Sequence, residues 1–426
     1  MDALSLNAGE VQPALHRFIG ALQHYPYLVA LNSNQKRDGL PPHYHHFDWM
    51  VAASSHASLE VASVGNAFEQ LKISRQSKKW QFGFLTYELK NELESLSSEQ
   101  PDGLGFPAMA FMEPEWLFVC QNGRIDCLLQ ADKTHWHHWL EGDVAADVSL
   151  PKISFQRHVS DADYLRTIED IREHIAAGTV YELNYCMEWS AVVSKLDGPT
   201  VYRALNAKTQ APFSTYLQWN NRWLVGGSPE RFLRKAGSEL ISQPIKGTIR
   251  RAADAELDEQ LRQQLANDEK EKAENIMIVD LVRNDLSRSC RAGTVQVPAL
   301  QQVYTFATVH QMISTVRGEM KDASQGIEAI AAAFPMGSMT GAPKIKAMEL
   351  IEALEKSKRG LYSGAIGYFK PNDDFDFNVV IRSLQYNAQT GYLSLMTGGA
   401  ITYDSIPAQE LAECELKAAA LLGLFA

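Results

Sequence analysis

The order of helical and strand patterns in the second part of the chain restricts its fold more than any other feature. Apolar residues three and four positions apart predict a helix that ends at Gly178, a long helical stretch over residues 256–291 and a helix over residues 343–360. Short apolar runs predict strands at Trp223–Val225, Ala365–Phe369, Val379–Leu384 and Tyr392–Thr397. This order predicts an α+β protein, because a doubly wound sheet needs strands and helices in regular alternation.

Composition and charge exclude other classes of protein. The 426 residues, 45% hydrophobic and 21% charged, exclude collagen-like, coiled-coil and largely disordered chains. The net charge of −11 would repel polyanions, so we expect no nucleic acid and no membrane as partners. The N-terminal residues have no signal-peptide pattern, and we expect a cytoplasmic protein. Residues 1–150 and 151–426 differ in sequence pattern: the first region has short strand-like runs between loops, and the second has clear helices and strands. We expect the two regions to form one compact body.

Two pairs of glutamates form the first group of candidate residues. Glu271 and Glu274 in one predicted helix, and Glu410 and Glu413 in another, stand at positions i and i+3 and therefore share a helix face. Lys417 follows on the same side of the second helix. If the two pairs met, carboxylates ~4 Å apart would repel each other by roughly 4 kcal/mol at an effective dielectric constant of about 20. Only a divalent cation would make this arrangement tolerable, and oxygen ligands alone favour Mg²⁺.

Short segments rich in glycine and polar residues form the second group. Such turns let the backbone approach a ligand and present N–H groups to anions. Together with the glutamates they occur in a fixed order: Ser228-Pro229-Glu230-Arg231-Phe232, Pro244-Ile245-Lys246-Gly247-Thr248, Ala273-Glu274, Val279-Asp280-Leu281-Val282-Arg283-Asn284-Asp285-Leu286, Gly341-Ala342-Pro343-Lys344 and Ile381-Arg382-Ser383. Over about residues 155–425 this order resembles the chorismate-utilising enzymes, the family of the anthranilate, aminodeoxychorismate, isochorismate and salicylate synthases.

The resemblance implies a fold and a metal site. Two antiparallel sheets would stack, with helices on their outer faces and the active site between the two halves. The glutamate pairs would converge on Mg²⁺, with Glu274 and Glu413 as direct ligands and with Glu271 and Glu410 acting directly or through water. The ion would hold the ring carboxylate of chorismate and help the C4 hydroxyl group to leave.

The resemblance also implies how the chain binds chorismate, which is a dianion. Glu230 would act as general acid and base at C4, which requires a carboxyl group kept protonated near neutrality by burial. The other contacts would come from residues at family positions: Arg382 and Lys417 for a carboxylate, Tyr368, Gly398 and Gly399 for the enolpyruvyl carboxylate, and His310, Ser338 and Thr340 in the wall of the pocket.

Lys246 distinguishes among the activities of the family. Anthranilate synthases usually have alanine at this position, and isochorismate and salicylate synthases have a lysine base where this chain has Glu182. Lys246 is typical of component I of aminodeoxychorismate synthase, in which the lysine attacks C2 as the C4 hydroxide leaves and is then displaced by ammonia at C4. We therefore expect conversion of chorismate and ammonia to 4-amino-4-deoxychorismate, for p-aminobenzoate and folate synthesis.

Two alternatives and one partner follow from the same comparison. The alternatives are anthranilate synthase component I, which releases pyruvate, and a non-catalytic subunit that binds chorismate or tryptophan. None of the five cysteines lies in a Gly-x-Cys-x-Gly turn of the kind that carries a glutaminase nucleophile. We therefore expect a separate glutamine amidotransferase subunit to supply ammonia.

Overall fold

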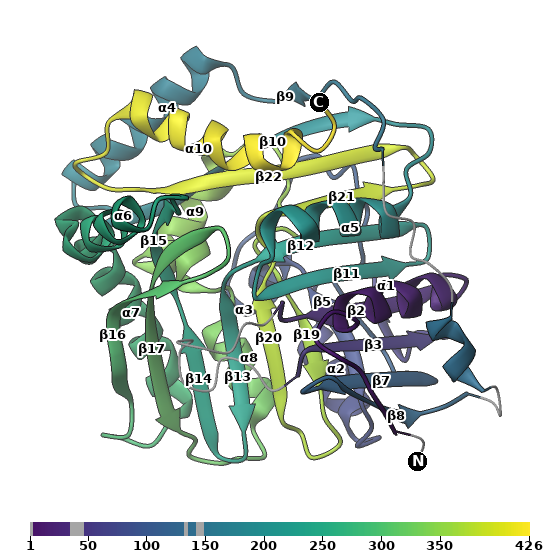
Figure 1. Ribbon diagram of the computed structural model, residues 1–426. Coiled ribbons are helices and arrows are strands. Elements are labelled where there is room, and N and C mark those ends of the chain that lie inside the picture. The colour runs from purple at the N-terminus through teal and green to yellow at the C-terminus, as the bar shows by residue number, and fades with distance from the viewer. Residues whose placement is uncertain (1–2, 35–46, 132–134, 142–148) are drawn as a thin grey trace.

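The computed structural model describes residues 3–34, 47–131, 135–141 and 149–426, and these form two large antiparallel sheets (Figure 1). The first sheet has the strand order β1 (Ala3–Ser5), β8 (Arg124–Leu129), β7 (Trp116–Gln121), β3 (Trp49–Ser54), β2 (Tyr27–Asn32), β11 (Phe213–Trp219), β12 (Arg222–Ser228), β21 (Ser383–Asn387), β22 (Tyr392–Ile401), β10 (Glu182–Val192) and β18 (Gly341–Ala342), and β9 (Gln156–Arg157) also pairs with β10. The second has the order β15 (Ile245–Arg250), β17 (Val309–Glu319), β14 (Glu239–Gln243), β13 (Arg231–Ala236), β20 (Phe375–Val379), β19 (Ala365–Phe369), β5 (Gln81–Leu85), β6 (Met109–Met112) and β4 (Leu59–Val61), and β16 (Gln296–Thr305) also pairs with β17.

Helices lie against the outer faces of both sheets, as Figure 1 shows for α10 along β22. The α-helices are α1 (Val11–Leu22), α2 (Ala67–Arg75), α3 (Lys90–Leu93), α4 (Asp161–Ala176), α5 (Gly198–Thr209), α6 (Ala255–Asn267), α7 (Glu269–Ser289), α8 (Gly326–Ala333), α9 (Lys344–Leu354) and α10 (Pro407–Leu422). The 3₁₀-helices are η1 (Tyr87–Leu89), η2 (Trp136–Leu140) and η3 (Gly337–Met339). Among the described helices, none has the length and apolar character needed to cross a bilayer.

The alternation of side chains along each strand explains why the sheets stack. In β2, Leu28 and Ala30 belong to an apolar cluster that also contains residues of α1, α4, α5 and α10, whereas Val29 and Leu31 point into a layer shared with the second sheet. Successive side chains of a strand point to opposite faces, so an apolar run in a strand buries both of its faces. The other face of the second sheet packs against α2, α7 and α8. The expected α+β architecture of stacked sheets with outer helices is confirmed, and each sheet contains strands from residues 1–150 and from 151–426.

Two predicted helices differ from the structure in their ends. The stretch over residues 256–291 is two helices, because Asp268 ends α6 and its carboxylate accepts a hydrogen bond of 3.0 Å from the backbone N–H of Glu271 at the start of α7. A side chain that caps a new helix in this way redirects the backbone. The predicted helix over residues 343–360 is α9, which already ends at Leu354.

Two of the points at which the chain crosses between the two sheets are neighbours, and they position the site described below. Glu230 lies where β12 of the first sheet leads into β13 of the second. Arg382 lies where β20 of the second sheet leads into β21 of the first, so the prediction of one strand over Val379–Leu384 is wrong. Arg382 has a φ of 52°, which ends the extended backbone there. The crossings are joined by backbone hydrogen bonds from Gly227 to Arg382, 2.9 Å, and from Val379 to Glu230, 3.1 Å.

Candidate active site

A cavity of about 720 Å³ opens beside the two crossings. Its walls come from α7, α10, β15, β22 and η3 together with the crossings themselves. Most of the residues that the sequence predicted for the site line this cavity: Glu230, Lys246, Glu271, Glu274, Ser338, Arg382, Gly398, Gly399, Glu410, Glu413 and Lys417.

Glu230 forms a buried acidic corner of the cavity with Ser338. The side-chain hydroxyl of Ser338 donates a hydrogen bond of 2.6 Å to Glu230 Oε1. Burial raises the pKa of Glu230 to about 7, although this hydrogen bond and the charge of Lys246 oppose the shift. Near neutrality this carboxyl group is therefore protonated in part of the molecules, as a general acid requires.

Lys246 enters the cavity from an irregular point of β15. The register with β17 shifts between Ile245 and Thr248, and such a bulge redirects side chains. Gly247 makes this turn possible: its φ is 85°, and a Cβ atom there would lie 2.9 Å from Leu265.

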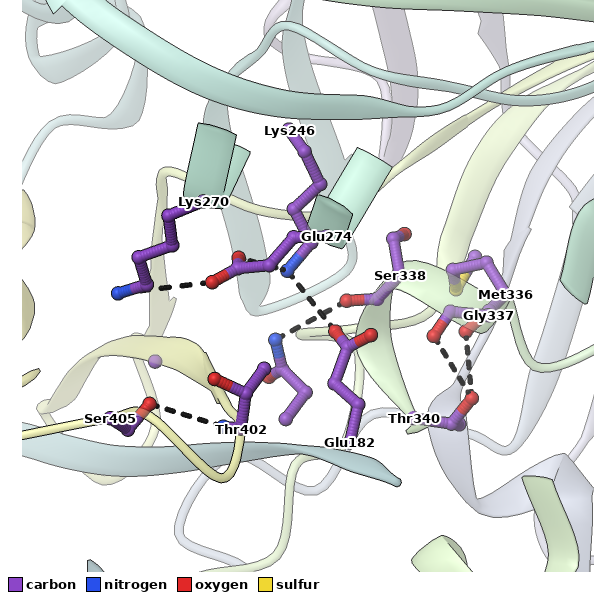
Figure 2. Close-up of polar contacts among 12 residues, drawn as sticks. Glu182, Lys246, Lys270, Glu274, Met336, Gly337, Ser338, Thr340, Thr402 and Ser405 are labelled. Carbon is purple, nitrogen blue, oxygen red and sulfur yellow. Dashed lines mark hydrogen bonds and ion pairs between the residues drawn. The ribbon is translucent and has the colours of Figure 1, made fainter. Parts of the chain in front are cut away.

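The Lys246 ammonium lies between two carboxylates. Its Nζ is 3.2 Å from Glu182 Oε1 and 3.6 Å from Glu274 Oε2, and the side chain is 13% exposed (Figure 2). Burial would lower the pKa of Lys246, but the charges of Glu182 and Glu274 outweigh burial and raise that pKa above its ordinary value. In this arrangement Lys246 is an ammonium ion and not the neutral amine that a nucleophile needs.

The four glutamates predicted as metal ligands, here called the glutamate cluster (Glu271, Glu274, Glu410 and Glu413), lie on α7 and α10, and lysines lie among them. Lys270 Nζ is 3.3 Å from Glu410 Oε1 and 3.8 Å from Glu274 Oε1. Lys417 Nζ is 2.7 Å from Glu413 Oε1. The prediction that only a divalent cation could hold these carboxylates together is therefore wrong, because the ammonium groups reduce the repulsion.

The donor set of the glutamate cluster fits a hard cation. Buried Glu274 Oε1 accepts no hydrogen bond from any described group. Burial, followed by the charges of Glu274 and Glu413, raises the pKa of Glu271 to about 7, which indicates negative charge that the lysines do not fully compensate. In the present arrangement of the described side chains, no three His, Cys, Asp or Glu residues are placed to share an ion.

Another part of the cavity, at Arg382 and Gly398, is suited to an anion. Arg382 forms no ion pair with any described carboxylate, so its guanidinium group is available to a ligand carboxylate. Gly398 lies so close to β10 that a Cβ atom there would be 2.4 Å from the carbonyl oxygen of Tyr185. Lys417 donates to the carbonyl oxygen of Gly398 at 2.8 Å and so ties this wall to the glutamate cluster.

Comparison with known proteins identifies the family. The sequence profile described as chorismate binding enzyme matches residues 30–423. The chain belongs to the chorismate-binding enzyme family. The chloroplastic aminodeoxychorismate synthase of Arabidopsis thaliana is 42% identical over 274 residues, which are 64% of this chain but only 30% of that relative. Aminodeoxychorismate synthase component 1 of Bacillus subtilis is 33% identical over 356 residues, 80% of this chain and 75% of the relative. Anthranilate synthase component 1 of Thermus thermophilus is 33% identical over 353 residues, 80% of this chain and 76% of the relative.

Solved structures of the chorismate-binding family share the fold. Anthranilate synthase component I from Streptococcus pneumoniae superposes with a TM-score of 0.71 at 27% identity and covers 80% of each chain. The menaquinone-specific isochorismate synthase from Escherichia coli has a TM-score of 0.76 at 18% identity, over 100% of this chain and 94% of that one, and is a likeness of fold alone.

Three residues predicted for the chorismate pocket do not line the cavity. Tyr368 points into the layer between the sheets and packs on Phe82 with ring centroids 5.7 Å apart. His310 is buried on the other side of β17, where Nε2 is 3.1 Å from Asp258 Oδ1. Thr340 directly follows η3, and its hydroxyl group donates back to the backbone carbonyl oxygens of Met336 and Gly337 (Figure 2).

The structure adds residues that the prediction of the site omitted. Tyr362 lines the cavity six residues before Tyr368, in the turn that precedes β19. Its place in a turn next to a strand was a usable signal, because binding residues are frequent in such connections. Lys270 also lines the cavity, and its position four residues before Glu274 predicts contact along a helix. Asn184 lines it as well and donates to the carbonyl oxygen of Ser338 at 3.2 Å.

Proposed function

We propose that this chain is component I of an aminodeoxychorismate synthase, which converts chorismate and ammonia to 4-amino-4-deoxychorismate. The observation that carries the proposal is Lys246, which extends into the cavity beside Glu182 and Glu274 from the motif Pro244-Ile245-Lys246-Gly247-Thr248. The relatives named aminodeoxychorismate synthase, at 33% and 42% identity, support it. The anthranilate synthase from Thermus thermophilus is equally similar at 33%, so the choice depends on the site.

The chemistry of the cavity suits a dianionic substrate with a leaving group. Arg382 would bind one carboxylate of chorismate, because its guanidinium group has no ion-pair partner among the described residues. Tyr362 and the backbone at Gly398 and Gly399 line the same wall and would bind the other carboxylate. Glu230, with a pKa raised to about 7 by burial, would give a proton to the C4 hydroxyl group as it leaves. Ser338 would orient that proton through its hydrogen bond to Glu230.

The glutamate cluster would hold Mg²⁺, because four carboxylates of two helices line one cavity and Glu274 Oε1 has no hydrogen-bond donor among the residues that the structure describes. A bound Mg²⁺ would supply positive charge for a substrate carboxylate and for the departing hydroxyl group. Glu274 and Glu413 would be the direct ligands. Without such an ion, a cavity with this many carboxylates would repel the substrate.

Lys246 would attack C2 of chorismate as the C4–O bond breaks, and ammonia would then add at C4 as the C2–N bond breaks. For this, Lys246 must first lose a proton, which the charges of Glu182 and Glu274 oppose. Neutralisation of Glu274 by another cation would remove one of these two charges. The alternative is that Lys246 stays charged and only binds a carboxylate. If Lys246→Ala forms aminodeoxychorismate at the wild-type rate and intact mass shows no adduct during wild-type turnover, the covalent role is wrong.

The decisive test of the proposed function is the mass of the product. Purified protein is incubated with chorismate, MgCl₂ and ammonium chloride at alkaline pH. The products are separated, and their masses are measured by mass spectrometry. We expect 4-amino-4-deoxychorismate with no release of pyruvate. Formation of anthranilate together with pyruvate would show that the chain is an anthranilate synthase instead. Absence of any turnover of chorismate would contradict both activities.

A separate glutaminase subunit is the proposed source of ammonia in the cell. The Bacillus relative is named as a component, and the present chain has no cysteine in a glutaminase-like turn. We expect no turnover with glutamine in place of ammonium until an amidotransferase subunit is added. Glutamine-dependent turnover by the purified chain alone would refute this part of the proposal.

A further inference from the structure

We propose that Lys270 is an internal cation of the glutamate cluster that must leave its position when Mg²⁺ binds, so that Lys270 sets the affinity for the ion. The inference rests on the metal site of the proposed function. Lys270 Nζ lies between α7 and α10, 3.8 Å from Glu274 Oε1 and 3.3 Å from Glu410 Oε1. These carboxylates are two of the four proposed to hold Mg²⁺, and Figure 2 shows Lys270 pointing at Glu274 from the side opposite to Lys246.

Lys270 is the most exposed of Lys246, Lys270 and Lys417, the lysines described here that pair with the glutamate cluster. Its side chain is 50% exposed, whereas that of Lys246 is 13% exposed and that of Lys417 is 24% exposed. Lys417 is also fixed by its hydrogen bond to the carbonyl oxygen of Gly398. Among the described residues, the Lys270 ammonium has no hydrogen-bond acceptor other than Glu410. A long side chain at the rim of the cavity can therefore move into water, where its charge is solvated again.

Lys270 and a divalent cation exclude each other for electrostatic reasons. An ammonium group and Mg²⁺ that contacted the same carboxylate oxygens would lie only about 4 Å apart, and their charges would repel. Mg²⁺ needs oxygen ligands at short distance, so the lysine must give up Glu274 and Glu410. Breaking these pairs reduces the affinity for Mg²⁺, and removal of the lysine charge should increase it. A half-exposed ion pair of this kind corresponds to a factor of about five in affinity.

The test is calorimetric titration of metal-free protein with MgCl₂ in the absence of chorismate. We compare the wild type, Lys270→Gln and the control Lys272→Gln. Lys272 lies on the same helix and carries the same charge, but its partner is Glu269, 3.5 Å away, outside the cluster. We expect Lys270→Gln to bind Mg²⁺ about fivefold more tightly than the wild type, and Lys272→Gln to stay within about twofold.

Thermal unfolding gives a second, independent result. Because the metal-free Lys270→Gln protein lacks its internal cation, Mg²⁺ should raise its Tm by more than it raises the Tm of the wild type or of Lys272→Gln. Equal or weaker Mg²⁺ binding by Lys270→Gln, with the wild type still forming 4-amino-4-deoxychorismate, would overturn this inference and leave the proposed function intact. Absence of Mg²⁺ binding in all three proteins would overturn both the inference and the metal site, whereas the product assay still decides the reaction.

Discussion

Glu230 and Glu274 are buried carboxyl groups on different walls of one cavity, and their neighbours differ. Glu230 is hydrogen-bonded to the neutral hydroxyl group of Ser338, and burial raises its pKa to about 7. Glu274 lies between the ammonium groups of Lys246 and Lys270, which oppose the effect of burial on its pKa. The same fold thus prepares one carboxyl group as a proton donor and another as a cation ligand, through the charges placed around each.

The largest effect is expected when a proposed Mg²⁺ ligand of the glutamate cluster is removed. Glu274→Gln, or Glu413→Gln, removes a charged ligand, so Mg²⁺ affinity should fall by more than about 100-fold and turnover should become undetectable. EDTA should stop the wild type in the same way, and excess MgCl₂ should restore it. The matched control is Glu269→Gln, because Glu269 lies on the same helix but its side chain is 90% exposed. Full activity of the wild type in EDTA without bound metal would contradict the account.

Glu230→Gln should affect proton donation to the leaving group and leave Mg²⁺ binding unchanged. The amide cannot donate the proton to the leaving group, so kcat should fall by about 10²- to 10⁴-fold. The affinity for Mg²⁺ should stay within about twofold of the wild type, because Glu230 is not a member of the glutamate cluster. Rates and calorimetric titrations of the same preparation check both statements. A loss of Mg²⁺ binding in Glu230→Gln would show that Glu230 and the glutamate cluster do not act separately.

Arg382→Lys tests the wall that binds the substrate. A lysine keeps the charge but loses the planar pair of donors, and a lost charged hydrogen bond corresponds to a rise in the KM for chorismate of about 10- to 100-fold. Mg²⁺ binding in the absence of chorismate should not change. Steady-state kinetics against chorismate measures the effect, and an unchanged KM would remove Arg382 from substrate binding.

The smallest and most specific effect is expected for Ser338→Ala. The hydroxyl group donates to Glu230 and lowers its pKa, so its removal should raise that pKa above the wild-type value of about 7. Activity that needs protonated Glu230 should therefore persist to a pH about half a unit to one unit higher. The pH profile is measured at a fixed concentration of unprotonated ammonia, with Ser338→Thr as a control that keeps the hydroxyl group. A shift to lower pH would contradict the role of this hydrogen bond.

The sequence could predict those parts of the site in which backbone and function are coupled locally. Gly247 next to Lys246 is such a case, because the left-handed turn that only glycine adopts easily belongs to the bulge that directs the lysine. The spacing of Glu271 and Glu274 also places two carboxylates on one helix face without knowledge of the fold.

The sequence did not show which face of a strand a candidate side chain occupies. Val309 and Gln311 line the cavity, so His310 between them points to the opposite side of β17. Tyr368 shares the face of Ile366 and therefore lies between the sheets, whereas Tyr362 lies in the cavity. An error of one residue moves a side chain to the other face of a sheet, and motif order alone does not exclude it.

Contacts between distant segments were beyond the reach of the sequence. The two neighbouring crossings at Glu230 and Arg382 depend on the pairing of strands more than a hundred residues apart. The lysines among the glutamates are a second example, because Lys246 meets Glu182, and Lys270 meets Glu410, only in the folded chain. Spacing along one helix indicates Lys270 beside Glu274, but not that the same ammonium contacts Glu410.

The most direct test of the contrast between Glu230 and the glutamate cluster is the titration of Glu230 itself. Protein labelled with ¹³C at the glutamate side-chain carboxyl groups is titrated by NMR in the presence of MgCl₂, and Glu230→Gln identifies the resonance by its loss. We expect Glu230 to titrate near pH 7 even with the cation bound, because burial and not the glutamate cluster raises its pKa. A titration near the ordinary glutamate value of about 4.3 would mean that Glu230 is a carboxylate at neutral pH, and the assignment of the proton donor would be wrong.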